Sequence, residues 1–295
     1  MKRLLPPSPL PRPARGRIAA ILLACAAVLV SITPASAQTA PAAKPDAQAI
    51  LMHMAQFMSK LPSFSVDVRD AYDTVQKSGQ KIEYGETRKI TVARPDRMRI
   101  EAVESDGDRQ TLIIDAKDIT LFSQPANVFA QTPSPGSLDQ AIVRFVRDLG
   151  MRLPFAVLLV STAPTDIERR TKTLDYVEKT SILGAPAHHI AGRTDGVDYQ
   201  IWIADGDKPL PLRLVLTYTD EQGEPQFRAQ FSDWKLAPQL TDATFAFTPP
   251  PGARRIAFLA EMPRSVAPAT AKATTATTAT TATKSAATVN AGEKK

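Results

Sequence analysis

The sequence has little of what covalent or metal-based chemistry requires. Its 295 residues include one cysteine and three histidines. A single cysteine forms neither an intramolecular disulfide nor a cysteine-based zinc site. The motifs G-x-S-x-G, G-x-x-x-x-G-K and H-E-x-x-H, which mark hydrolases, phosphate-binding loops and metalloproteases, do not occur. We therefore expect a protein that is not an enzyme and that holds no cofactor and no metal.

The three histidines are poorly placed for chemistry. His53 lies in an expected helix and has no histidine partner four residues away. His188 and His189 are adjacent in an expected strand, so their side chains point to opposite faces of the sheet. Structural positions account for them best, with metal binding and acid/base catalysis as the alternatives.

Carboxylates also lack the arrangement of a catalytic pair. Asp115 and Asp118 flank an expected turn, and Asp166 and Glu168 belong to an expected charged loop. Such residues are typical of solvated turns. We find no nucleophile with a plausible base beside it.

The excess of positive charge lies at the two ends of the chain. The formal charge is +6, of which residues 1–37 carry +5 and residues 263–295 carry +4, so residues 38–262 carry −3. The basic character therefore does not belong to the part that folds. We expect no binding to nucleic acid.

The first 37 residues have the three parts of a secretory signal. Residues 1–17 are basic, residues 18–32 are almost wholly apolar, and an Ala-x-Ala sequence ends at Ala37. The apolar run is shorter than the roughly 20 residues of a membrane span. We predict cleavage after Ala37 and a periplasmic location, which leaves a mature protein without a thiol. An uncleaved anchor and lipoprotein processing at Cys25 are the alternatives.

The rest of the chain divides into a linker, a body and a tail. Residues 38–45 are a short Pro/Ala-rich linker, and residues 46–262 are long enough for one sizeable domain. Residues 263–295 are rich in alanine and threonine, without apolar periodicity or aromatics. We expect this tail to be disordered, or to act as a surface tether.

Hydrophobic periodicity in the body predicts strands on either side of helices. Apolar residues recur every three or four positions over 47–60, and again from a capping box at Ser137 to a predicted stop at Gly150; Pro154 then opens a second segment of a helical pair. Residues 155–160 are apolar all round, which indicates burial. Alternating strands with one apolar face and short turns fill the rest. We predict an α+β fold in which a curved antiparallel sheet, an open half-barrel, is covered by helices at 47–60 and 137–160.

Several short motifs point to a family. They are Ala93–Ile100 (ARPDRMRI), Asp106-Gly107, Leu121-Phe122, Gly184–His189 (GAPAHH), Gln200–Ile203 (QIWI), Lys208–Arg213 (KPLPLR) and the closing Phe247–Gly252 (FTPPPG). With them, residues 46–256 resemble a group of predicted periplasmic proteins related to the LolA/LolB lipoprotein carriers. The resemblance implies a half-barrel with a helical lid over an apolar cavity, which in the carriers holds lipid acyl chains. It also implies that Arg94, in the Arg-Pro motif, helps to hold the lid closed.

The predicted ligand contacts lie on the lid and on the concave face of the sheet. The lid candidates are Phe155, Leu158 and Leu159. The sheet candidates are Phe64, Val66, Tyr84, Ile90, Val92, Met98, Ile100, Tyr199, Ile201, Leu214 and Leu216, and Arg94 is the candidate lid contact. Trp202 falls on the opposite face from Ile201, where it either packs at an edge or offers a partner surface.

Two functions fit these sequence patterns. We expect a monomer that binds or carries an apolar ligand, either a lipid or the acyl chain of an acylated protein. The alternative is an envelope-sensor module that binds a protein partner and no lipid.

Overall fold

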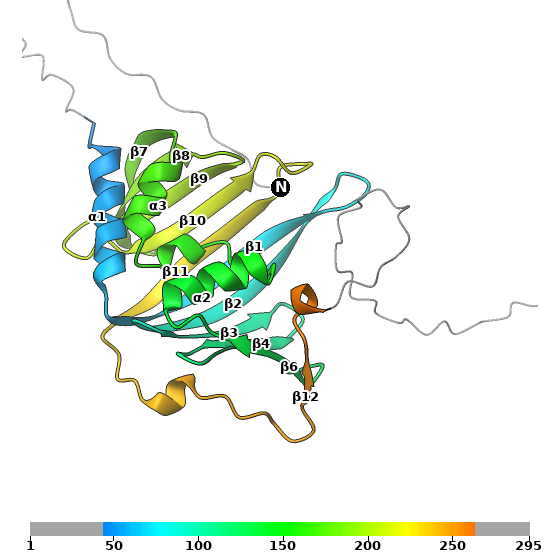
Figure 1. Ribbon diagram of the computed structural model, residues 1–295. Helices are drawn as coiled ribbons and strands as arrows, with labels where there is room; N and C mark the ends of the chain where they lie inside the picture. Colours follow the sequence, from blue (N-terminus) through cyan, green and yellow to red (C-terminus); the bar gives the residue numbers. More distant parts are fainter. Residues whose placement is uncertain (1–43, 263–295) are drawn as a thin grey trace, which may run out of the picture. The chain divides into compact units, whose positions relative to one another are not determined.

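The computed structural model describes residues 44–262, which build a 12-stranded sheet and three α-helices (Figure 1). The helices are α1 (Ala47–Lys60), α2 (Leu138–Val143) and α3 (Ala163–Arg170). The strands are β1 (Ser63–Val75), β2 (Lys81–Ala93), β3 (Arg97–Glu104), β4 (Arg109–Ile114), β5 (Asp118–Ser123), β6 (Val128–Pro133), β7 (Thr173–Ile182), β8 (Ala185–Arg193), β9 (Val197–Ala204), β10 (Pro211–Tyr218), β11 (Gln226–Leu236) and β12 (Arg254–Ile256). The predicted signal, most of the linker and the predicted tail lie outside these residues.

The strand order shows how the chain builds one sheet from two runs of strands. The order is β12-β6-β5-β4-β3-β2-β1-β11-β10-β9-β8-β7. The chain runs outward from β1 to β6, crosses through the helices to the far edge at β7, and returns strand by strand to β11, which pairs with β1. All neighbours are antiparallel except β12 and β6. The predicted antiparallel α+β fold is confirmed.

The helices cover one face of this sheet. Figure 1 shows α1, α2 and α3 on the same side, with the sheet curving around them. Helix α1 contacts β7, β8, β9 and α3. Within residues 44–262, no helix is long and apolar enough to cross a membrane.

Helix α1 forms where the sequence predicts it. The Asp46 carboxylate caps it by accepting a hydrogen bond from the Ala49 N–H at 3.1 Å. The helix ends at Lys60, because Leu61 takes an extended conformation before Pro62. The apolar stripe that it buries consists of Leu51, Met54, Ala55 and Met58.

The helix predicted from Ser137 to a stop at Gly150 forms, whereas the second helix predicted after Pro154 is wrong. The Ser137 hydroxyl does cap α2, accepting from the Gln140 N–H at 3.3 Å. A single π-helical turn follows α2 and ends at Asp148. Gly150 then takes a φ of 69°, in the left-handed region that glycine tolerates. After it, only a short 3-10 turn at Ala156–Leu158 is helical, so the apolar run is mostly buried but not a helix.

The charged loop predicted around Asp166 and Glu168 is instead helix α3. Pro164 occupies its first turn, where the missing N–H of proline costs nothing. The Thr162 hydroxyl donates to the Asp166 carboxylate at 2.7 Å, and Ala163 is buried. The eight-residue helix is highly charged, and its short apolar face was too weak a signal to recognise in the sequence.

Candidate ligand-binding cavity

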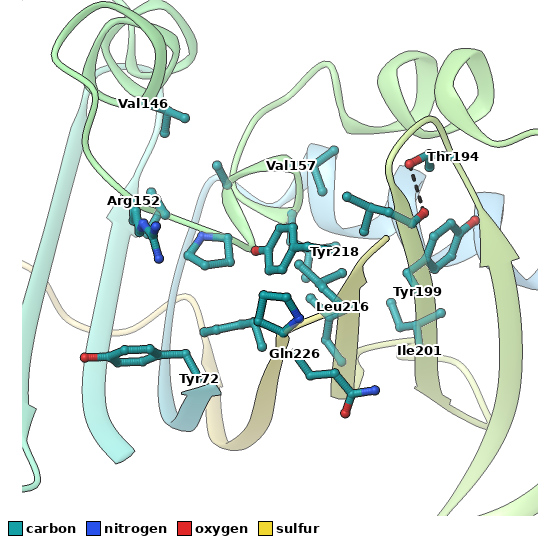
Figure 2. A pocket seen from close by; sticks show the side chains of 18 of the residues that line it. Tyr72, Val146, Arg152, Val157, Thr194, Tyr199, Ile201, Leu216, Tyr218 and Gln226 are labelled. Carbon is teal, nitrogen blue, oxygen red and sulfur yellow. Dashed lines mark hydrogen bonds between the residues drawn. The ribbon is translucent and has the colours of Figure 1, made fainter. Parts of the chain in front are cut away.

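A cavity of about 810 Å³ lies between the helical side and the sheet (Figure 2). Strands β9, β10 and β11 with parts of β1 and β2 form one wall, and the stretch from the π-helical turn to α3 forms the other. We call residues 150–160 the lid segment. The volume falls in the range of about 300–1,000 Å³ that is typical of small-molecule sites.

The walls of the cavity are largely apolar. On the strand side, Leu214 pairs with Ile201 and Leu216 pairs with Tyr199 in neighbouring strands. Alternate residues of a strand share a face, so these four side chains line the cavity together. The apolar side chains facing them are Val146, Met151, Leu153, Pro154, Ala156, Val157, Leu158 and Ile167.

The structure separates the predicted ligand contacts into two groups. Those that line the cavity are Leu158, Tyr199, Ile201, Leu214 and Leu216. Those that are packed in the core, each at most 3% exposed, are Phe64, Val66, Ile90, Val92, Met98, Ile100, Phe155 and Leu159. The alternation of apolar residues identifies the apolar face of each strand. It does not identify which part of that face borders a cavity and which part is packed against the helical side. Contact of the core residues with a ligand stays a prediction.

Tyr84 lies just outside the cavity. It is 42% exposed, and its ring stacks on that of Tyr72, with centroids 5.8 Å apart. Tyr72 is the direct cross-strand neighbour of Tyr84 and itself lines the cavity. Tyr84 therefore packs against Tyr72, a residue of the cavity wall, and does not line the cavity itself.

Arg94 joins the lid segment to two helices. Its Nε donates to the Leu61 carbonyl at 3.2 Å, at the end of α1. Its Nη2 donates to the Leu159 carbonyl at 2.8 Å, in the lid segment. Its Nη1 lies 3.6 Å from the carboxylate of Asp139 in α2. The same carboxylate accepts a hydrogen bond from the Ser161 N–H at 3.0 Å. The guanidinium thus holds the lid segment at one end.

Trp202 lies between two side chains of neighbouring strands. Its ring stacks on that of His189 with centroids 4.0 Å apart, and the guanidinium of Arg213 lies 5.4 Å from its centre. His189 also pairs with Gln200 at 3.1 Å, and His188 with Asp205 at 3.1 Å. These contacts account for both histidines and for Trp202 structurally, and the partner surface stays a prediction.

Beside the apolar wall lies a charged cluster that the sequence did not predict. Arg88 and Glu86 line the cavity, and Arg88 reaches Asp70 at 2.8 Å and Glu86 at 2.6 Å. Its guanidinium also lies over the ring of Phe155, 5.6 Å from the centroid. Only the register reveals the cluster, because Asp70 and Glu86 prove to be direct cross-strand neighbours.

Asp70 is a buried carboxylate with few partners. It is 3% exposed, and neither carboxylate oxygen accepts a well-formed hydrogen bond from the described residues. Burial raises the pKa of Asp70 from 3.8 to about 7, and the negative charge of Glu86 also raises it. The positive charge of Arg88 lowers this pKa, but by less than burial raises it. The carboxyl of Asp70 is therefore a titratable group close to the cavity.

Comparison with known proteins places the chain in a family. Residues 47–259 match the family described as "Predicted periplasmic protein (DUF2092)", and the chain belongs to this family. This confirms the predicted family and agrees with the predicted location. Cleavage after Ala37 stays a prediction. No curated protein matches the chain. Within residues 44–262, no group of three histidine, cysteine, aspartate or glutamate residues could hold a metal ion.

Solved structures with a similar fold include three from different bacteria. An uncharacterized conserved protein from Thermus thermophilus is 14% identical, with 72% of this chain and 98% of that one covered and a TM-score of 0.43. The lipoprotein LppX from Mycobacterium tuberculosis is 14% identical, with 66% and 97% covered and a TM-score of 0.42. A LolA superfamily protein from Nitrosomonas europaea is 11% identical, with 69% and 98% covered and a TM-score of 0.34.

Proposed function

We propose that this chain is a periplasmic binding protein that takes the apolar chain of a lipid, or of an acylated protein, into the cavity beneath the lid segment. The observation that carries the proposal is the cavity of about 810 Å³ between apolar strand residues and the lid segment. Its lining in the described part of the chain includes no histidine, cysteine or serine. The role that we propose is binding without turnover.

Burial of apolar groups would supply the affinity. Each methylene removed from water contributes about 0.8 kcal/mol. Ten methylenes would contribute about 8 kcal/mol, which corresponds to a Kd near 1 μM before the cost of ordering the chain. A modest acyl chain is thus a sufficient ligand without any polar contact.

The proposal is tested by titration with a neutral apolar probe. The fluorescence of N-phenyl-1-naphthylamine rises on transfer from water to an apolar site. We expect saturable binding of one probe per chain to the protein purified from a bacterial periplasm, and displacement by a twelve-carbon amphiphile. Fluorescence that rises without saturation, and that no amphiphile reverses, would count against the proposal.

The lid segment should open more readily when Arg94 is replaced by leucine. The variant loses two hydrogen bonds from a charged group, to the carbonyls of Leu61 and Leu159, each worth about 1.5–3 kcal/mol. We expect amide hydrogen exchange in residues 155–162 to rise at least tenfold, which mass spectrometry can measure.

A matched control is available three residues away. Arg97 is more exposed and pairs with Asp242 at 2.8 Å, with no contact to the lid segment. Arg97→Leu should leave exchange in residues 155–162 unchanged. Equal exchange rates in the wild type and in Arg94→Leu would show that Arg94 does not hold the lid segment.

A further inference from the structure

Two arginines of the cavity lining, Arg152 and Arg170, have no acidic partner in the described part of the chain. Arg152 lies in the lid segment, is exposed, and lines the cavity. Nearby arginines are paired: Arg144 with Glu261, Arg147 with Asp148. Among residues 44–262, Arg152 forms neither an ion pair nor a hydrogen bond. Its charge is therefore available to a ligand.

The hydroxyl of Tyr218 lies near this free guanidinium. In Figure 2 the Tyr218 hydroxyl points toward the side of the cavity where Arg152 lies. Burial raises the pKa of Tyr218, and the charge of Arg152 acts to lower it. The same two effects act in the same directions on Tyr72. The positive charge of Arg152 therefore acts on the hydroxyls of both Tyr72 and Tyr218. In residues 44–262 the Tyr218 hydroxyl has no hydrogen-bond partner.

The cavity lining holds three arginines and three carboxylates, so its formal charges balance, but only some of them are paired. The carboxylate of Glu86 is paired with Arg88, and that of Asp73 with Arg228 at 2.9 Å. The lining groups without an ion pair in the described residues are Arg152, Arg170 and Glu221. Glu221 lies close enough to Tyr218 to raise the pKa of that phenol. A negatively charged ligand group could therefore pair with the guanidinium of Arg152 without breaking an ion pair among the described residues.

We propose that the cavity binds a single-chain amphiphile whose headgroup is a carboxylate or a phosphate. The headgroup binds the guanidinium of Arg152 and the hydroxyl of Tyr218, and the chain extends along Leu216 and Ile201. Guanidinium groups form two parallel hydrogen bonds with both kinds of anion. This inference rests on the proposed function and adds the chemical class of the ligand.

The test compares three ligands that share a twelve-carbon chain. The test measures how well laurate, dodecyl phosphate and dodecanol each displace N-phenyl-1-naphthylamine from the protein purified from a bacterial periplasm. We expect at least one of the two anions to bind about tenfold more tightly than dodecanol, the gain of a hydrogen bond to a charged group. The stronger of the two anions identifies the headgroup as carboxylate or phosphate.

Variants assign the effect to the proposed residues. Arg152→Gln should weaken binding of the preferred anion about tenfold and leave dodecanol unchanged. Tyr218→Phe should weaken the same anion severalfold. Arg147→Gln is the matched control, because Arg147 is exposed in the same region, pairs with Asp148 and does not line the cavity. It should bind all three ligands like the wild type.

The outcomes separate the two proposals. If all three ligands bind equally and Arg152→Gln changes none of them, the headgroup site is overturned while the proposed function stands. If none of the ligands displaces the probe from the wild type, the proposed function fails and the headgroup site fails with it.

Discussion

Tryptophan at both Val157 and Leu216 is expected to weaken the binding of a twelve-carbon chain about fiftyfold. Val157 lies in the lid segment and Leu216 in β10, and both line the cavity (Figure 2). The two indole rings would occupy space that the ligand needs. If they exclude about three methylenes, about 2.4 kcal/mol of binding free energy is lost, which corresponds to that factor.

Both positions are half-buried, so the added rings extend into the cavity rather than into the packed core. Displacement of N-phenyl-1-naphthylamine measures the affinity, and thermal unfolding checks that the fold is intact. Val177→Trp adds a ring at a position in β7 that is 47% exposed and away from the cavity, and should bind normally. A stable double variant with wild-type affinity would mean that the ligand does not lie beneath the lid segment.

Replacing Arg88 with methionine is expected to lower the free energy of unfolding by about 3–5 kcal/mol at pH 8. The variant keeps Asp70 buried but removes the cation that lies 2.8 Å from it. At pH 5 the loss should be smaller, because a carboxyl with a pKa of about 7 is already neutral there. Urea unfolding at the two pH values measures the difference.

The sign of the pH dependence follows from Asp70 itself. Its pKa is about 7 in the folded protein and 3.8 ordinarily, so the folded state keeps a proton that the unfolded state releases between these values. The contribution of Asp70 to stability is therefore complete below about pH 4 and is lost as the pH rises to about 7. The Asp70→Asn variant has no carboxyl at this position and does not lose stability in this way. Its free energy of unfolding relative to the wild type should therefore rise between about pH 4 and pH 7.

Two further variants test the assignment to this pair. Asp70→Asn combined with Arg88→Met should recover part of the stability at pH 8, because position 70 then carries no buried charge, whereas Glu86 still lacks its partner. Arg97→Met breaks the exposed pair with Asp242 and should cost about 1 kcal/mol or less. A loss in Arg88→Met that is equal at pH 5 and pH 8 would contradict the account of Asp70.

The parts of the fold that the sequence predicts depend on local patterns. Helix α1 was recognisable because its cap at Asp46, its apolar stripe and its stop at Pro62 all lie within 17 residues. The antiparallel sheet followed from alternating strands joined by short turns. The stop at Gly150 was recognisable, but the segment after Pro154 was wrongly predicted as helix, because the same apolar residues that favour a buried helix also suit a buried irregular segment.

The cavity was predicted only in part, for a physical reason. Ile201 and Leu214 line it, whereas Ile90 and Val92 are fully packed, yet all four follow the same alternation. Whether an apolar strand residue faces a cavity depends on what covers it, and this is decided by tertiary packing. The cluster around Arg88 depends on strand register, and nothing local distinguishes Arg152 from other arginines.

Native mass spectrometry of the exported protein, purified from a bacterial periplasm, tests the central claim most directly. We predict one amphiphile bound per chain, released by organic extraction and identified by its mass. A mass equal to that of the protein alone, with no adduct after incubation with laurate, dodecyl phosphate or dodecanol, would contradict the account and make the cavity part of an ordinary core.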